Sequence, residues 1–173
     1  MKKNVDSLRS ALDLLRTMPG QLLETNTAVN TEAELAGIYR YVGAGGTVSR
    51  PTKEGPAMLF HNIQNHPGTS VAIGLLASRK RVAALLDCPA QELGKKLFRC
   101  TEHPVPPVLS QKPAPCQEII HKSSDLGFDL HKLLPAPTNT PDDAGPYITL
   151  GMCYATHPDT GLHDVTIHRL CIQ

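Results

Sequence analysis

Aromatic residues are scarce in this sequence, which has no tryptophan, three phenylalanines and four tyrosines in 173 residues. The scarcity argues against modules that bind nucleic acids by base stacking, because such modules need aromatic platforms. The formal net charge is only +1, and the basic residues are scattered along the chain. No surface for a polyanion is therefore predicted, and nucleic acid is not an expected partner.

Paired cysteine motifs and long apolar runs are also missing. The five cysteines are odd in number, and no two of them form Cys-x-x-Cys, so neither a disulfide framework nor a zinc knuckle is predicted. No apolar run approaches the length of a membrane span, and the first residues have no signal-type apolar core. These observations predict a cytoplasmic protein that does not contact a membrane.

Hydrophobic residues make up 40% of the chain and charged residues 19%, which is typical of a globular protein. Leu8, Leu12 and Leu15 have helical spacing, with Asp6 or Ser7 as the N-cap. Further elements are predicted in the first half. They are a strand over 21–25, a helix over 31–41 opened by a Thr31–Glu34 capping box, strands over 56–60 and 70–77, and helices over 79–87 and 89–99.

Two segments of this first half carry possible chemistry. Gly43–Gly46 is predicted to be a flexible turn, because a phosphate-binding loop would need a following Lys-Ser/Thr or GxGxxG spacing. Arg79–Arg81 places three cations in the first turn of a helix, where they oppose the helix dipole. We interpret these cations either as a solvated helix start or as a contact for an anion or partner.

A proline-rich stretch over 103–115 is predicted to be an extended connector between two modules. A strand over 117–122, one helical turn over 129–134 and a hairpin over 147–157 and 163–173 are expected after it. The fold class is therefore α+β. The predicted domains are an α/β module over 1–115 and a second domain that begins at 116.

The last predicted strand concentrates polar chemistry. Alternation places Asp164, Thr166 and His168 on one face, and Val165 and Ile167 on the other. Asp164 and His168 then lie about 13 Å apart along the strand, too far to bind one ion. The strand therefore predicts one ligand of a shared metal site, and a complete metal site within the strand is excluded.

The neighbouring Arg169 has two open interpretations. Its guanidinium has the fork geometry that binds a carboxylate or a phosphate. A surface arginine paired with a nearby acid would have the same sequence context. The residues alone leave both interpretations standing.

Three long segments resemble one family. They are ETNTAVNTEAELAGIYRYVGAGGTVSRPTKEGPAMLFHNI, LPAPTNTPDDAGPYITLGM and HDVTIHRL. They are similar to the N-terminal part of UbiD-family decarboxylases, and within them to the branch that acts on hydroxybenzoic acids such as gallate and protocatechuate. The resemblance implies that residues 116–173 are the first strands of a split β-barrel flavin-binding domain.

The resemblance further implies reversible, non-oxidative decarboxylation of an aromatic carboxylic acid. The implied cofactors are prenylated FMN, supplied by a flavin prenyltransferase, Mn²⁺ (or Mg²⁺) and K⁺. Residue by residue, Asp164 matches the ligand of the divalent ion, and Arg169 matches an arginine close to the flavin and the catalytic carboxylates. The residues that match the segment lining the flavin are Thr166, Ile167, His168, Arg169 and Leu170.

Members of this family continue well beyond the region of resemblance. That further part carries the second and third metal ligands and the catalytic glutamates, so we expect this chain alone to be inactive. Two alternatives are a non-catalytic subunit that complements a separately encoded remainder and a truncated remnant. Self-association into a homo-oligomer is also open.

Overall fold

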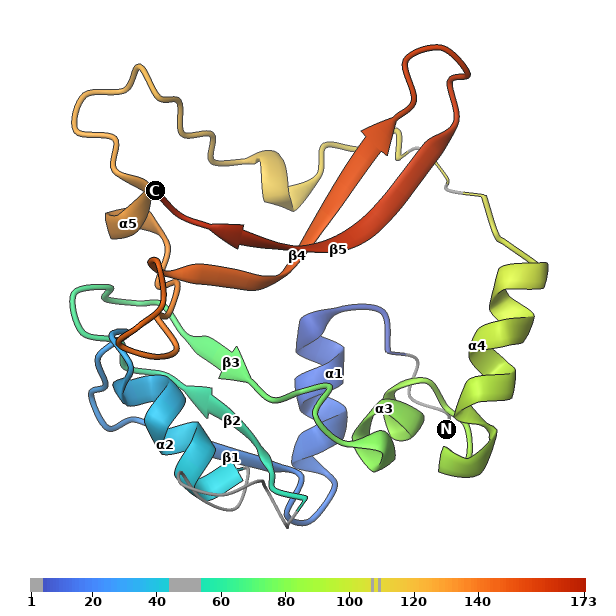
Figure 1. Cartoon of the computed structure of the whole chain (residues 1–173), viewed down its shortest axis with the longest axis horizontal. Coiled ribbons are helices and arrows are strands. Elements are labelled where there is room, and N and C mark those ends of the chain that lie inside the picture. Colours follow the sequence, from blue (N-terminus) through green and yellow to red (C-terminus); the bar gives the residue numbers. More distant parts are fainter. Residues whose placement is uncertain (1–4, 44–53, 107, 109) are drawn as a thin grey trace.

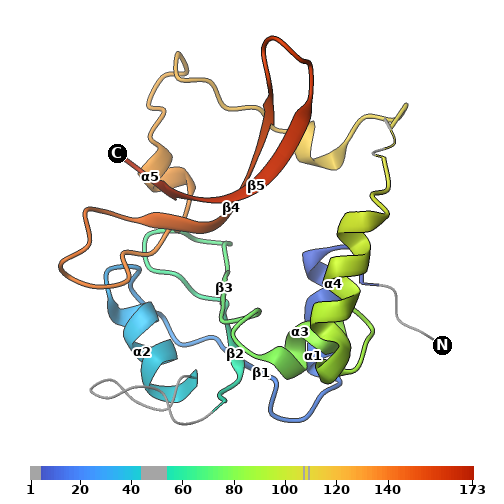
Figure 2. The same cartoon turned by 45° about the vertical axis from the view of Figure 1, so that its right-hand side comes forward.

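The computed structural model describes residues 5–43, 54–106, 108 and 110–173. A three-stranded sheet with helices forms the first half, and a long loop region leads into a β-hairpin (Figure 1). In both views the loop end of the hairpin points away from α2, whereas the start of β4 lies beside β3 (Figure 2). This arrangement confirms the predicted mixed fold class. The elements are α1 (Leu8–Arg16), β1 (Leu22–Thr25), α2 (Glu34–Gly43), β2 (Ala57–Phe60), β3 (Val71–Ile73), α3 (Arg79–Leu85), the 3₁₀ helix η1 (Ala90–Glu92), α4 (Leu93–Glu102), the 3₁₀ helix η2 (Pro115–Gln117), α5 (Leu130–Leu133), β4 (Tyr147–Thr156) and β5 (His163–Cys171).

The first helix, α1, forms where the leucine spacing predicts it. Ser7 is its N-cap, and the Ser7 hydroxyl accepts a hydrogen bond from the Ser10 N–H while the Ser10 hydroxyl accepts one from the Ser7 N–H. This reciprocal capping satisfies N–H groups that the first turn leaves without helical partners. Leu12 and Leu15 are buried but Leu8 is 57% exposed, so the predicted apolar face of α1 is confirmed for two of its three leucines.

The sheet has the order β1-β2-β3, with β1 parallel to β2 and β2 antiparallel to β3. All four residues of the central strand β2 are buried, which matches its unbroken apolar sequence. Phe60 and Met58 join Val29, Leu35 and Ile63 in the main core cluster, and α2 packs against β2. The core therefore lies between α2 and the middle of the sheet.

The start of α2 differs from the prediction. The helix begins at Glu34, and Ala33 has a φ of +60°, so the helix cannot extend back to Thr31. The Glu34 carboxylate accepts a hydrogen bond from the Asn30 N–H at 2.7 Å. The expected Thr31–Glu34 capping box is therefore wrong. Residues 44–46 of the predicted glycine turn lie outside the described residues.

The strand predicted over 70–77 is also shorter, because β3 ends at Ile73. Gly74 follows with a φ of +76°, a backbone conformation that takes the chain out of the extended region. The carbonyl of Gly74 accepts a hydrogen bond from Arg81 Nη2 at 2.9 Å. The hydrogen bond from Arg81, a residue of α3, thus fixes the backbone just after the end of β3.

The interpretation as a solvated helix start is wrong for Arg81, whose side chain is only 1% exposed, and it holds for the exposed Arg79 and Lys80. The Arg81 guanidinium donates to the carbonyls of Gly55 (2.7 Å) and Leu75 (3.4 Å) and to the side-chain oxygen of Gln21 (3.3 Å). Burial lowers the pKa of Arg81 from its usual value. This arginine therefore joins three segments at one end of the sheet, while the two basic residues before it are exposed.

The predicted strand over 117–122 is wrong. The described chain there has the 3₁₀ helix η2 and then no regular structure, and Ile119 and Ile120 are 76% and 69% exposed. A strand needs a hydrogen-bonded neighbour, and no described strand lies beside this segment. This segment therefore has no strand to pair with among the residues that the structure describes.

The predicted hairpin is confirmed. β4 and β5 pair antiparallel from Thr156↔His163 to Tyr147↔Cys171. The register shifts between Ile148 and Gly151 of β4. Ile148 and Gly151 are three residues apart on β4, but their partners Leu170 and His168 are two residues apart on β5. The extra residue forms a bulge in β4, and β5 keeps its regular alternation.

An ion-pair network links α1 to the sheet. The Arg16 guanidinium donates to both oxygens of the Glu24 carboxylate, at 2.7 and 3.1 Å, and His61 Nε2 lies 2.7 Å from the same carboxylate. The hydrogen bonds from Arg16, and next those from His61, lower the pKa of Glu24 from 4.5 to about 2. α1 is thereby fixed to β1 by electrostatics as well as by its leucines.

We expect Glu24→Gln to lower the stability of the folded chain at pH 7 and to reduce its acid sensitivity. A carboxyl whose pKa is lower in the folded state stabilises the fold above its unfolded pKa of about 4.5, and this stabilisation is lost as the pH falls toward 2. Urea midpoints of both proteins between pH 7 and pH 2 measure the effect, with the exposed Glu102→Gln as control. Parallel pH profiles for the wild type and Glu24→Gln would contradict the prediction.

Candidate functional site

The register of the hairpin divides the residues predicted to line the flavin between two faces. Asp164, Thr166 and His168 lie opposite Ala155, Cys153 and Gly151, so their side chains share one face of the hairpin. The structure thus brings the acid, the hydroxyl and the imidazole to one side. On the same face lies Leu170, opposite Ile148, whereas Val165, Ile167 and Arg169 lie on the other face.

Asp164 is exposed, and its carboxylate accepts a hydrogen bond from the Val165 N–H at 2.8 Å. An exposed carboxylate suits a hard divalent ion as one oxygen ligand. In the part of the chain that the structure describes, no group of three His, Cys, Asp or Glu residues could hold a metal ion. The exposed carboxylate of Asp164 is open to an ion, and its role as one metal ligand stays a prediction.

Arg169 lies over an aromatic ring on the opposite face. Its guanidinium carbon is 5.9 Å from the centroid of the Tyr147 ring. Tyr147 pairs across the hairpin with Cys171, and a hydrogen bond with the Cys171 thiol is the main cause that raises the pKa of Tyr147. The arginine, the ring and the thiol therefore form one cluster at the base of the hairpin.

Large apolar side chains on the face that carries Arg169 are open to solvent. Met152 is 74% exposed and pairs with Ile167, which is 63% exposed. Tyr154 is 65% exposed and pairs with Val165, which is 52% exposed. We call these four residues the hairpin apolar face. A contiguous apolar surface of this kind is typical of a face that another element covers.

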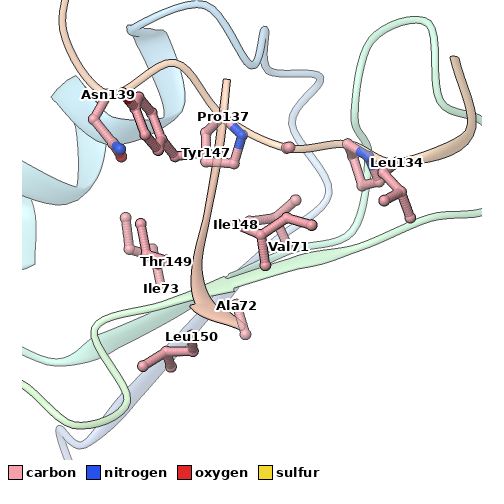
Figure 3. A pocket seen from close by; sticks show the side chains of 12 residues that line it. Val71, Ala72, Ile73, Leu134, Pro137, Asn139, Tyr147, Ile148, Thr149 and Leu150 are labelled. Atoms are coloured by element: carbon pink, nitrogen blue, oxygen red, sulfur yellow. The ribbon is translucent and has the colours of Figure 1, made fainter. Parts of the chain in front are cut away.

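A pocket of about 350 Å³ lies between β3 and the start of β4. Val71, Ala72 and Ile73 line one side, and the residues of β4 that line the other include Tyr147 and Ile148. Figure 3 shows Asn139 and Tyr147 side by side at one end, far from Leu134. None of the residues predicted to line the flavin lines this pocket.

Sequence reasoning missed both Tyr147 and the pocket. Tyr147 meets Arg169 only through the cross-strand register, and the pocket joins segments far apart in sequence. The apolar start of β4 was the only signal of either feature, and it predicts a buried strand equally well.

Two family domains match the chain. Residues 13–101 match the N-terminal domain of 3-octaprenyl-4-hydroxybenzoate carboxy-lyase, termed UbiD_N, and residues 108–173 match its Rift-related domain, termed UbiD. The chain belongs to the UbiD family. This membership confirms the resemblance read from the three sequence segments. The predicted domain boundary at residue 115 stays a prediction.

Relatives and solved structures agree with the UbiD assignment. Gallate decarboxylase of Lactiplantibacillus plantarum is 47% identical over 167 residues, which are 96% of this chain and 34% of that protein. The structure of 3,4-dihydroxybenzoic acid decarboxylase from Klebsiella pneumoniae matches with a TM-score of 0.87 and 51% identity over 96% of this chain and 34% of that one. A UbiD-class enzyme from Pelotomaculum thermopropionicum, in complex with prFMN, matches with a TM-score of 0.79 and 32% identity over 94% and 35% of the two chains.

This UbiD chain thus spans about a third of the length of the relatives that it matches. The matched third includes the strand β5, which carries every residue predicted to bind the metal or the flavin. Among the described residues, no helix is long and apolar enough to cross a membrane.

Proposed function

We propose that this chain is the N-terminal part of a non-oxidative decarboxylase of hydroxybenzoic acids that uses prenylated FMN. The observation that supports the proposal is its 47% identity to a gallate decarboxylase and its 51% identity to a 3,4-dihydroxybenzoic acid decarboxylase, each over 96% of the chain. A related UbiD-class structure holds prFMN, which supports the cofactor. Location in the cytoplasm belongs to the proposal and fits the five free thiols.

Asp164 is proposed as one ligand of a Mn²⁺ or Mg²⁺ ion, with K⁺ nearby. A carboxylate oxygen is a ligand that these hard ions prefer. One ligand does not complete a coordination shell, and the described residues hold no group of three His, Cys, Asp or Glu residues that could bind the ion. Asp164 then orients the ion from one face of β5.

Thr166, Ile167, His168 and Leu170 are proposed to contact the flavin together with Arg169. These residues are divided between the two faces of β5, so a flavin on one face alone would not contact all of them. β5 pairs only with β4, so its other edge is free among the described strands. If this edge holds the flavin, side chains from both faces of β5 would contact it.

The proposed chemistry assigns distinct tasks to the residues and to the cofactor. When bound, prenylated FMN supplies the sink for the negative charge that forms on the ring carbon as CO₂ leaves. Arg169 holds the substrate carboxylate or a catalytic carboxylate with its guanidinium. Ile167 is apolar and excludes water beside it, which strengthens the attraction between these charges.

We expect the 173-residue chain alone to release no CO₂ from gallate or 3,4-dihydroxybenzoate with prenylated FMN, Mn²⁺ and K⁺. The reason is that the described residues hold no group of three ligands for a metal ion, and that the family resemblance places the catalytic glutamates outside the matched region. Gallate decarboxylase of L. plantarum, assayed in parallel, is the positive control. Substantial CO₂ release by the chain alone would contradict this part of the proposal.

A complementation role is the second candidate, and the exposed hairpin apolar face favours it. In the same assay, co-expression with the unmatched C-terminal part of the L. plantarum enzyme should give a complex with measurable decarboxylation. Met152→Lys, on the hairpin apolar face but outside the proposed flavin contacts, should prevent the complex because it buries a charge, whereas Val108→Lys, at a position 93% exposed, should not. Aggregation of the chain without any complex would instead support a truncated remnant.

A further inference from the structure

We propose that Tyr147 is a positioning residue for Arg169, with its ring holding the guanidinium on one face of the hairpin. The catalytic meaning of this inference rests on the proposed function, in which Arg169 acts beside the flavin. The contact itself depends only on the fold of the hairpin.

The geometry places Arg169 on the Tyr147 ring. A guanidinium within about 6 Å of a ring centroid is attracted to the negative face of the ring, and the observed separation is 5.9 Å. Tyr147 pairs with Cys171, two residues beyond Arg169, so both side chains lie on the same face. Among the residues that the structure describes, no carboxylate forms an ion pair with Arg169.

Tyr147 is itself held in place. Its N–H donates to the carbonyl of Pro137 at 3.0 Å, and the Ile172 N–H donates to the carbonyl of Pro146 at 2.9 Å. Its ring stands beside Pro137 at the edge of the pocket (Figure 3). The main-chain bonds thus fix the backbone from which the Tyr147 ring reaches Arg169.

The bulge in β4 explains why this ring is needed. His168 pairs with Gly151 and Leu170 pairs with Ile148, so Arg169 lies opposite the irregular part of β4. A long arginine on an exposed strand without a regular cross-strand neighbour samples many rotamers. The Tyr147 ring replaces that neighbour, and its removal should lower the population of the held rotamer about two- to fivefold.

The contact can be measured in the chain without any cofactor. In wild type and Tyr147→Phe, the Arg169 Nε–Hε NMR signal should be shifted upfield by the ring, and in Tyr147→Leu it should return toward the position of a free arginine. Tyr154→Leu is the matched control, because Tyr154 lies on the same face but pairs with Val165. An Arg169 signal that is unchanged in a folded Tyr147→Leu variant overturns the proposal.

A second measurement applies where Tyr147→Leu fails to fold. The nearby Arg169 charge opposes the rise in the pKa of Tyr147. Arg169→Gln should therefore raise the titration midpoint of the Tyr147 phenol, followed by its carbon chemical shift. An unchanged midpoint overturns the proposal.

The functional role has its own test in the complemented decarboxylase. Tyr147→Leu should lower kcat about two- to fivefold with little change in KM, and Tyr147→Phe should retain kcat. If the complex decarboxylates its substrate but Tyr147→Leu has an unchanged kcat, the positioning role is wrong and the proposed function stands. If no complex is active, the NMR experiment on the chain alone still tests the contact between Tyr147 and Arg169.

Discussion

Replacement of Arg81 by methionine is expected to lower the free energy of unfolding by about 1–3 kcal/mol, the usual penalty for leaving a buried hydrogen-bonding group without its partner. The guanidinium is 1% exposed and donates four hydrogen bonds, three of them to main-chain carbonyls. Methionine fills much of the volume but donates nothing, so these carbonyls lose their partners without gaining water. Urea unfolding followed by circular dichroism measures the loss.

Lys80→Met is the matched control for this experiment, because Lys80 is the exposed neighbour on the same helix turn. A surface substitution of this kind usually changes stability by less than about 0.5 kcal/mol. Arg81→Lys keeps the charge but not the fork of donors, and it should fall between the two. Equal urea midpoints for Arg81→Met and Lys80→Met would show that the buried cluster contributes nothing.

Gly151→Val should weaken the pairing of β4 with β5 by about 1–3 kcal/mol, the usual cost of forcing extra atoms into a packed site. A Cβ at position 151 would lie 2.8 Å from the carbonyl oxygen of His168 and 2.9 Å from a methyl carbon of Leu170. The backbone of β5 must therefore move, and it carries all five residues proposed to contact the flavin. Amide hydrogen exchange along β5 reports the change.

Gly37→Ala provides the contrast for Gly151→Val. A Cβ at Gly37 meets nothing within 4 Å, and the position lies inside α2. Alanine is a better helix former than glycine by about 1 kcal/mol, so this variant should be slightly more stable. Unchanged exchange protection of β5 in Gly151→Val would show that the hairpin accommodates the larger side chain without loss of stability, which would contradict the prediction.

Sequence patterns correctly predicted the elements that are held by residues close together in sequence. The spacing of Leu12 and Leu15 and the Ser7 cap define α1, and the hairpin follows from two alternating segments around a turn. Predictions failed where a distant partner decides the outcome. Arg81 is buried because three separate segments present carbonyls to it, and residues 117–122 form no strand because no described neighbour pairs with them.

For the candidate site, too, the sequence predicted the local strand geometry but not the contacts between distant residues. Alternation along β5 correctly placed Asp164 and His168 on one face and showed that they cannot share an ion. The roles of these residues came from family resemblance, since a strand pattern carries no information about a cofactor. Tyr147 could not be associated with Arg169 before the register was known, because the bulge in β4 shifts that register.

The mixed pairing within the first sheet has a consequence for how the chain assembles. β2 and β3 pair through residues close together in sequence, as do β4 and β5, whereas the parallel pairing of β1 with β2 spans the whole of α2. Closing a longer loop costs more entropy before any contact forms. The two antiparallel ribbons should therefore form early, and docking of β1 with its attached helix α1 should limit the rate of folding.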